Sequence, residues 1–248
     1  MPEKNKNLVV IPAHNEEDAL PGTMDKLQSL PDGFELLVVN DGSTDFTSQL
    51  AHELAVTSRL PLHVVDLPLN GGIGAAVQTG YLFAAEAQRY DYVIQFDADG
   101  QHDVASIVTL VEQCERYDLD LCIGSRFLQA DSEGFQSTFS RRVGIRFLSN
   151  LIHLLSGVRA TDPTSGLRCA GPRAWMNFAQ QYPDDYPEPE SLYWCLRNKL
   201  RVGEVAVIMY PRQQGVSSIG TWRGAYYMAK VTLAILIDLL RPKEDPWV

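Results

Sequence analysis

Short runs of apolar residues alternate with segments of helical periodicity through the first half of the chain. The apolar runs are bounded by turn residues, as is typical of buried strands, and occupy residues 8–11, 34–39, 62–66, 92–96 and 119–123. Between them apolar residues recur at helical spacing, for example at Leu20, Met24 and Leu27. Strands and helices that alternate in this way form right-handed βαβ crossovers. The pattern therefore predicts an α/β fold with a mostly parallel central sheet flanked by helices.

The second half of the chain follows a less regular pattern. It predicts a loop to residue 140, a helix over 141–155, a turn over 162–168, a Pro- and acid-rich loop over 182–189, a strand over 200–209, a polar loop over 212–218 and an apolar helix over 222–240. No repeat or low-complexity linker interrupts it. We therefore expect a single domain over residues 1–218, with halves at 1–124 and 125–218, followed by a C-terminal helix and tail at 219–248.

Polar residues follow three of the predicted strands. Residues 12–16 follow the first strand, 40–45 the second and 97–102 the fourth. In a parallel sheet, ligands bind beyond the carboxyl ends of the strands, which is the edge where these segments lie. The sequence therefore predicts a ligand site at this edge.

Asp97 and Asp99 give the clearest chemical signal at this edge. Alternate residues at a strand end can direct both carboxylates into one cleft, where their repulsion is costly unless a cation lies between them. A divalent cation would also bind a diphosphate and stabilise it as a leaving group. The alternative is an N-cap for the following helix, but a cap needs one aspartate, more naturally Asp103. We therefore favour a metal site.

Two other segments fit either a structural or a binding role. Asp41 begins a turn with N-cap character, and Asn15 and Glu16 can cap the first helix. Pro12 disfavours a continuous strand-to-helix junction and would leave a small backbone-lined pocket that suits a nucleobase. A glycine-rich segment that includes Gly74 follows the third strand rather than the first, so we reject a dinucleotide-binding motif. Its backbone N–H groups still suit a phosphate or a sugar.

The chain of 248 residues is acidic, with a net charge of -10 and a pI of about 4.9. This balance repels phosphate polymers, so nucleic acid is not an expected partner. To bind a small phosphate-bearing ligand, the chain needs positive charge at the site itself, from a bound cation or from arginine side chains. The candidate arginines are Arg126, Arg141, Arg142, Arg146, Arg168 and Arg212. Arg142 and Arg146 share a helix face, which suits a phosphate-bearing acceptor.

Cysteine usage and hydropathy predict a cytoplasmic protein. The four cysteines show neither metal-binding nor disulfide spacing, so we expect them to be reduced. No apolar region resembles a signal peptide, and the longest apolar stretch, 231–237, falls far short of the roughly 20 residues that span a bilayer. The last helix is apolar around most of its circumference and has basic neighbours. Core packing, a membrane interface and self-association all fit it, and these alternatives stay open.

Together these motifs resemble family 2 glycosyltransferases, which are inverting enzymes with a nucleotide-binding A-type fold, and among them the polyprenyl-phosphate sugar synthases. The resemblance covers about residues 8–218. It implies that 1–124 is the nucleotide-binding half and 125–218 the acceptor half. The Gln-x-x-Arg-Trp motif of processive polysaccharide synthases is missing, which disfavours polymer extension.

The resemblance also implies roles for the matching residues. Asp99 and Gln101 would hold Mg²⁺ or Mn²⁺ with Asp97 beside them, and Arg212 would approach the donor diphosphate. Asp162, Ser165, Gly166 and Arg168 match a turn that walls the sugar site, and Ser218 stands where these synthases commonly have a lysine. Together with the residues singled out above, the expected donor site consists of Pro12, Ala13, His14, Asn15, Glu16, Val39, Asp41, Gly74, Asp97, Ala98, Asp99, Gln101, Arg126, Arg168, Arg212 and Ser218.

The expected reaction is the inverting, metal-dependent transfer of a sugar from a UDP- or GDP-sugar to polyprenyl phosphate at the cytosolic membrane face. Asp99 and Arg212 would act in catalysis, and Arg142 and Arg146 would bind the acceptor. An acceptor phosphate is already an anion, so it needs no strong general base.

Two alternatives remain. In the first, the acceptor is a hydroxyl of a saccharide or another small molecule, and Glu190, or Glu188, is the base. In the second, the chain binds sugar nucleotides without catalysis, which the retained pair of Asp97 and Asp99 disfavours.

Overall fold

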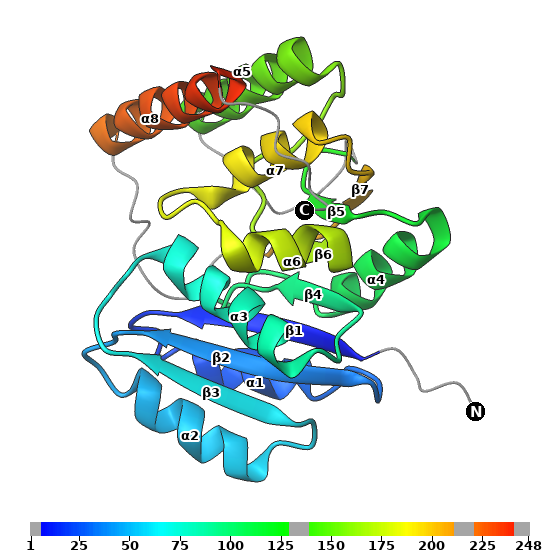
Figure 1. Ribbon diagram of the computed structural model, residues 1–248. Helices are drawn as coiled ribbons and strands as arrows, with labels where there is room; N and C mark the ends of the chain where they lie inside the picture. The colour runs from blue at the N-terminus through cyan, green and yellow to red at the C-terminus, as the bar shows by residue number, and fades with distance from the viewer. Residues whose placement is uncertain (1–5, 129–138, 211–220, 241–248) are drawn as a thin grey trace.

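The described residues form a seven-stranded sheet with strand order β3-β2-β1-β4-β6-β5-β7 (Figure 1). The computed structural model describes residues 6–128, 139–210 and 221–240. Its strands are β1 (Asn7–Ala13), β2 (Phe34–Asp41), β3 (Leu62–Leu67), β4 (Tyr92–Gln95), β5 (Leu121–Ser125), β6 (Arg168–Ala170) and β7 (Val202–Ala206). Its helices are α1 (Leu20–Leu27), α2 (Thr47–Thr57), α3 (Ile73–Ala87), α4 (Ala105–Tyr117), α5 (Phe139–Ser156), α6 (Pro172–Gln180), α7 (Pro187–Arg197) and α8 (Thr221–Leu240).

The sheet is mostly parallel, which confirms the predicted fold class. Strand β1 pairs in parallel with β2 and β4, β2 with β3, and β5 with β7. Strand β6 is antiparallel to both of its neighbours, β4 and β5. The five strands predicted in the first half are all present, with boundaries that differ by at most two residues.

The inner strands are apolar at consecutive positions because both faces of the sheet are covered. Leu8 and Val10 of β1 point into one hydrophobic core, and Val9 and Ile11 point into the other. Because successive side chains of a strand alternate between faces, one continuous apolar run supplies both cores.

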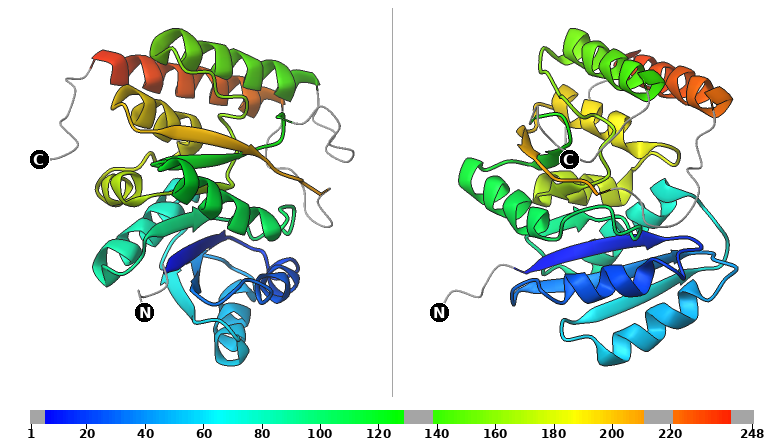
Figure 2. Two further views of the ribbon diagram at one scale, coloured as in Figure 1. Left: turned by 90° about the vertical axis from the view of Figure 1, so that its right-hand side faces the viewer. Right: turned by 180° about the vertical axis from the view of Figure 1, so that it is seen from behind.

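Helices cover the two faces of the sheet in separate layers (Figures 1 and 2). Helices α1 and α4 contribute to the core on one face, and α3, α6 and α7 to the core on the other. Helices α5 and α8 lie side by side beyond α7, and we call this pair the outer helix layer. The predicted helices over 141–155 and 222–240 correspond to α5 and α8.

Three segments of the second half differ from the prediction. Helix α7 begins at Pro187, inside the expected loop over 182–189, because proline is well suited to the first turn of a helix. Strand β6 begins at Arg168, where a turn was expected, and α6 was not predicted. The predicted strand over 200–209 is shortened to Val202–Ala206.

The four cysteines are free and buried. Among the described residues, no helix is both long and apolar enough to cross a membrane.

Candidate functional site

The connectivity of the sheet creates a crevice at the carboxyl ends of β1 and β4. The chain proceeds outward from β1 through β2 to β3 and then returns to place β4 on the other side of β1. Ligands of open α/β sheets bind at such a topological switch point. The polar segments that follow β1, β2 and β4 all leave the sheet at this edge, as the parallel pairing requires.

The segments after β1 and β2 are joined by hydrogen bonds. His14 Nδ1 donates to the Asp41 carbonyl oxygen at 2.7 Å, which leaves Nε2 to accept from the Asn70 amide at 3.0 Å. Asn15 Oδ1 accepts the backbone N–H of Thr44 at 2.8 Å. The side chains of His14 and Asn15 are exposed, whereas Pro12 and Ala13 are buried within β1. The strand continues through Pro12 to Ala13, and residues 14–19 separate it from α1, so the strand and the helix do not form a continuous junction, as expected.

Asp41 holds the glycine-rich segment in place. Its carboxylate, which is buried, accepts the backbone N–H groups of Gly71 at 2.7 Å and Gly72 at 2.9 Å. The N–H of Gly74 donates to the Asp184 carbonyl oxygen at 3.1 Å. These three N–H groups are thus occupied within the protein, and the expected phosphate or sugar contact near Gly74 finds no free donor among them.

Gly74 has a packing role instead. A Cβ built on Gly74 would lie 2.1 Å from the Pro183 carbonyl oxygen and 2.2 Å from that of Asp184. Only glycine permits this close approach between α3 and the segment before α7. Val39, another expected donor residue, is fully buried in the hydrophobic core, so its side chain presents no surface to a ligand.

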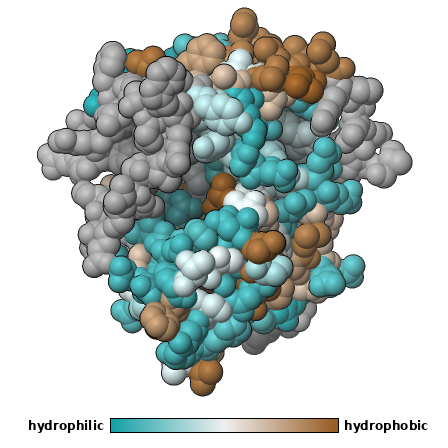
Figure 3. All heavy atoms as spheres, turned by 90° about the vertical axis from the view of Figure 1, so that its left-hand side faces the viewer, coloured by the Kyte–Doolittle hydropathy of each residue, from teal (hydrophilic) through white to brown (hydrophobic). Residues whose placement is uncertain are grey.

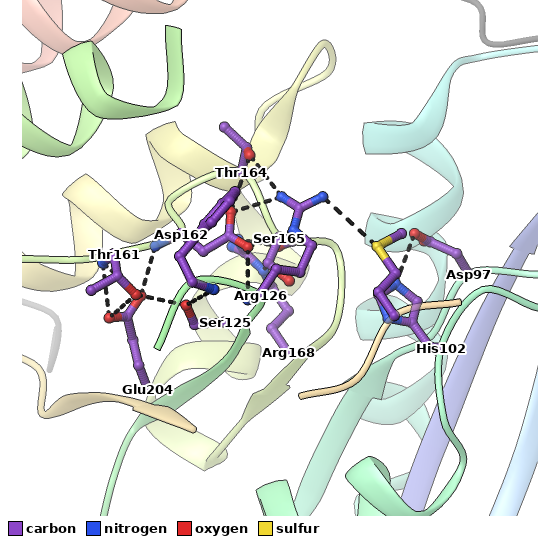
Figure 4. Close-up of polar contacts among 12 residues, drawn as sticks. Asp97, His102, Ser125, Arg126, Thr161, Asp162, Thr164, Ser165, Arg168 and Glu204 are labelled. Atoms are coloured by element: carbon purple, nitrogen blue, oxygen red, sulfur yellow. Dashed lines mark hydrogen bonds and ion pairs between the residues drawn. The ribbon is translucent and has the colours of Figure 1, made fainter. Parts of the chain in front are cut away.

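We call residues 97–102 the acidic loop. The side chain of Asp97 is 33% exposed, and its Oδ2 lies 3.6 Å from His102 Nε2 (Figure 4). Burial raises the pKa of Asp97, whereas its contacts with His102 and Gln95 and the charge of Arg126 lower it. The lowering effects are larger together, so the pKa of Asp97 lies below its ordinary value. Asp99 Oδ1 accepts the backbone N–H of Gln101 at 3.0 Å. Asp97 is therefore held in its anionic form.

The acidic loop has the donor chemistry that a hard divalent cation requires. Carboxylate oxygens of Asp97 and Asp99 are suited to Mg²⁺ or Mn²⁺, and Gln101 Nε2 donates to the Tyr210 carbonyl oxygen at 3.2 Å, which leaves Oε1 as its ligand atom. Among the described residues, no group of three or more His, Cys, Asp or Glu is placed to hold a metal. Mg²⁺ is commonly held by one or two carboxylates together with substrate phosphates, so the pair fits a cation that arrives with a diphosphate.

Arg126 is bound within the protein. It is buried and forms a two-pronged ion pair with Asp162, with Nε to Oδ2 at 2.6 Å and Nη2 to Oδ1 at 2.7 Å (Figure 4). Nη2 also donates to Thr164 Oγ1 at 3.0 Å. Its guanidinium therefore orients the turn before β6, and the direct donor contact that the sequence suggested does not follow from this geometry.

Arg168 is also internal and is fully buried. Its guanidinium donates to the Ser165 carbonyl oxygen at 2.8 Å, to the Glu188 carbonyl oxygen at 3.2 Å and to Ser191 Oγ at 3.0 Å. It therefore ties the turn before β6 to the first turn of α7. Like Arg126, it stabilises the turn before β6 through buried hydrogen bonds.

None of the other expected arginines is found at the acidic loop within the described part of the chain. Arg142 and Arg146 are exposed on α5, in the outer helix layer. Arg212, Ser218 and the side chain of Arg141 lie outside the part of the chain that the structure describes.

The two candidate bases point to different places, because residues two apart on a helix lie on opposite sides. Glu188 interacts with Arg168, Asp97 and Gln95. Burial and the charge of Asp97 raise the pKa of Glu188, and the charge of Arg168 lowers it. The net pKa lies above its ordinary value. Glu190 instead lines a cavity of about 410 Å³ between α7 and α8. The structure thus brings Glu188, rather than Glu190, to the acidic loop.

Gln95, just before the acidic loop, and His102, its last residue, were not assigned a role from the sequence. Gln95, at the end of β4, is 1% exposed, and its side chain lowers the pKa of both Asp97 and Glu188. His102 is buried and contacts Asp97. Gln95 is the last residue of β4 and stands two positions before Asp97, a spacing at which strand alternation would direct both side chains to the same side.

An open α/β sheet with a carboxylate-bearing loop at its switch point defines a protein that binds a small ligand at the carboxyl edge of the sheet. The sequence profile of glycosyl transferase family 2 matches residues 8–177. The chain belongs to this family and is a glycosyltransferase with the A-type fold.

The names of two relatives refer to a polyprenol phosphate or a dolichyl phosphate. The chain is 29% identical to the polyprenol monophosphomannose synthase of Mycolicibacterium smegmatis over 217 residues, which cover 86% of this chain and 81% of the relative. It is 29% identical to the UDP-N-acetylglucosamine–dolichyl-phosphate N-acetylglucosaminyltransferase of Methanococcus voltae over 212 residues, which cover 80% of this chain and 83% of the relative.

A solved structure shares the fold. The glucosyl-3-phosphoglycerate synthase of Mycobacterium tuberculosis, solved with Mn²⁺, UDP and glucosyl-3-phosphoglycerate, superposes with a TM-score of 0.62 at 20% identity. The match covers 97% of this chain and 82% of that one.

Proposed function

We propose that this glycosyltransferase transfers a sugar, with inversion and with the help of a divalent cation, from a nucleoside-diphosphate sugar to polyprenyl phosphate. The observation that carries the proposal is the pair of carboxylates, Asp97 and Asp99, at the switch point of the sheet. The names of two relatives, a polyprenol monophosphomannose synthase and a dolichyl-phosphate N-acetylglucosaminyltransferase, support the acceptor.

The donor would lie across the crevice, with its base near the exposed side chains of His14 and Asn15 and its diphosphate at the acidic loop. Asp97, Asp99 and Gln101 would hold Mg²⁺ or Mn²⁺, and the structural relative solved with Mn²⁺ and UDP supports a cation in this role. When bound, the cation supplies charge neutralisation on the leaving diphosphate. Asp97 is kept anionic by its neighbours, so its carboxylate is available to bind without first losing a proton.

The acceptor phosphate would attack the anomeric carbon in line with the leaving diphosphate. Because a phosphate oxygen is already anionic, the chain needs to orient it rather than deprotonate it. Attack from the side opposite the leaving group inverts the anomeric centre. Arg212 would bind the leaving diphosphate in this scheme, and Arg142 and Arg146 would attract the acceptor phosphate.

The outer helix layer supports a position at the membrane surface. Exposed apolar side chains lie along both of its helices, among them Phe147 and Leu154 of α5 and Leu233 and Leu240 of α8. Apolar side chains gather at the top of the molecule, where these helices lie (Figure 3). Residues 134–161 contain four arginines and no Asp or Glu, in a chain with a net charge of -10. An apolar and basic surface suits an anionic lipid headgroup region.

The first test of the proposal is a transfer assay. Sugar labelled with ¹⁴C is supplied as a panel of UDP- and GDP-sugars with polyprenyl phosphate in vesicles and Mn²⁺ or Mg²⁺. We expect label in the organic phase with at least one donor and none when EDTA is present. Label that never leaves the aqueous phase, with every donor and both cations, contradicts the proposal.

A hydroxyl acceptor is the second candidate function, and Glu188 favours it. This carboxyl group interacts with Asp97, and its raised pKa suits a general base. Glu188→Gln and Glu190→Gln form a matched pair within one turn of α7. If the acceptor is a hydroxyl, Glu188→Gln abolishes turnover and retains nucleotide binding, whereas Glu190→Gln remains active. If the acceptor is a phosphate, Glu188→Gln retains turnover.

A further inference from the structure

The acidic loop is held by residues that are distant in the sequence. The Tyr210 N–H donates to the Gln101 carbonyl oxygen at 2.7 Å, and His102 forms an antiparallel bridge with Met209. On the opposite side, Thr23 Oγ1 of α1 donates to the Ala98 carbonyl oxygen at 2.8 Å. The backbone of the loop is therefore fixed from two sides before any ligand binds.

The Asp97 side chain is confined in the same way. A Cβ on Gly166 would lie 2.9 Å from Asp97 Oδ2 and 3.2 Å from Oδ1, so the turn before β6 closes against one side of the carboxylate. His102 Nε2 lies 3.6 Å from Oδ2. The His102 side chain is only 2% exposed, and its ring packs against Phe96 with centroids 5.8 Å apart.

The contacts of the imidazole select one tautomer. His102 Nδ1 is buried and has no hydrogen-bond partner, whereas Nε2 faces a carboxylate. A buried N–H without an acceptor is costly, so the proton belongs on Nε2, where it points to Asp97. The ring is thus oriented by Phe96 and by the bridge to Met209, and it presents a single donor to Asp97 (Figure 4).

We propose that His102 is the positioning residue of the cation site, which fixes one carboxylate oxygen of Asp97 from behind so that the other faces the cation of the bound donor. The inference rests on the proposed function, because it takes Asp97 to be a metal ligand. Groups that hold a metal ligand in this way typically contribute about 10- to 100-fold to metal affinity. A role in packing alone would change stability and leave the cation affinity of the folded protein unaltered.

The test compares His102→Gln with His102→Met. The two side chains have nearly the same shape, but only glutamine retains an N–H donor at the reach of Nε2. The Mn²⁺ affinity of each folded variant is measured by electron paramagnetic resonance in the presence of UDP or GDP, whichever the wild type binds. Thermal unfolding is recorded alongside. His153→Met, at an exposed histidine of α5, is the control.

We expect His102→Met to weaken Mn²⁺ binding by about 10- to 100-fold, and His102→Gln and His153→Met to retain wild-type affinity. A double-mutant cycle adds an independent check: in an Asp97→Asn background, His102→Met should cause no further loss. Wild-type affinity in His102→Met, or an equal loss in His102→Met and His102→Gln, overturns the inference. Absence of Mn²⁺ binding by the wild type overturns the proposed function itself.

Discussion

The loops after β1 and β2 and the acidic loop after β4 lie at one edge of the sheet, but they are held in different ways. The first two are joined to each other and to the glycine-rich segment by hydrogen bonds among residues 14–72, as His14 with Asp41 and Asp41 with Gly71 illustrate. The acidic loop depends on α1, on the turn before β6 and on Met209 and Tyr210. The loops after β1 and β2 are thus joined to each other by residues of the first half of the chain, and Gly74 of the glycine-rich segment contacts the second half, at Pro183 and Asp184. The acidic loop has supports from both halves of the chain.

We therefore expect that the proposed nucleotide contacts and the proposed cation contacts can be perturbed separately. Substitutions among the residues that join the loops after β1 and β2, such as Asp41, should affect the loops that we propose to face the base. Substitutions in the second half should reach the cation site through its supports.

The largest effect is expected at the cation site. Asp99→Asn removes a proposed ligand and should lower kcat/KM for sugar transfer by about 1000-fold, which corresponds to about 4 kcal/mol of lost transition-state stabilisation. Asp103→Asn is the matched control, because Asp103 Oδ1 accepts the Ala105 N–H at 3.3 Å at the start of α4 and has no proposed ligand role. Equal losses in both variants would assign the effect to the fold of the loop.

The next effect concerns the buried ion pair that supports the site. Asp162→Asn leaves the buried Arg126 without a counter-charge and should lower the free energy of unfolding by about 3 kcal/mol, measured in urea. Asp32→Asn breaks the exposed pair with Arg59, in which Asp32 is 83% exposed, and should cost less than about 1 kcal/mol. A cost at Asp162 no larger than that at Asp32 would show that Arg126 finds another partner.

A smaller effect is expected at the loops after β1 and β2. Asp41→Asn replaces one of the two oxygens that accept the Gly71 and Gly72 N–H groups and should cost about 2 kcal/mol in unfolding free energy. Nucleotide affinity measured without metal should fall in parallel, while the Mn²⁺ affinity of the acidic loop stays unchanged. A loss of Mn²⁺ affinity in this variant would break the distinction between the two sides.

The smallest effect is a pH dependence far from the crevice. Burial raises the pKa of Glu35, but hydrogen bonds from Tyr90 and His63 and the charge of Arg89 lower it below its ordinary value of 4.5. Because the folded pKa is depressed, the stabilisation is fully present above pH 4.5 and is lost as the pH falls through the folded pKa. The stability advantage of the wild type over Glu35→Gln, about 1 kcal/mol, should therefore shrink below pH 4.5 in urea titrations. An advantage independent of pH rules out this origin.

The same contrast explains how much of the structure the sequence predicted. Strands β1 to β5 are apolar runs with turn residues at their ends, so the sheet, its direction and the position of the acidic loop follow from local patterns. Strand β6 has three residues, Arg168–Ala170, and begins with a buried arginine, so no local pattern marks it as a central strand. Its position depends on hydrogen bonds with β4 and β5, which are distant in the sequence.

Among the expected site residues, the position was predictable where a local sequence pattern sets it and unpredictable where distant contacts hold it. The acidic loop lies at the edge where the sequence placed it, whereas Arg126 and Arg168 proved to be internal because Asp162 and Ser165 bind them. No spacing rule reveals such a pair. Which of Glu188 and Glu190 lies at the acidic loop depends on the helical geometry of α7. The sequence did not predict the start of this helix, because its prolines are typical of a loop.

Calorimetric titration of UDP and GDP, with and without Mn²⁺, measures whether the cation and the donor bind at one site, as we propose. We expect one of the two nucleotides to bind the wild type at least about tenfold more tightly with Mn²⁺, and we expect Asp97→Asn and Asp99→Asn to lose this increment while they keep the metal-free affinity. Nucleotide binding that is equally tight with and without Mn²⁺ in the wild type contradicts a cation held between the acidic loop and the donor.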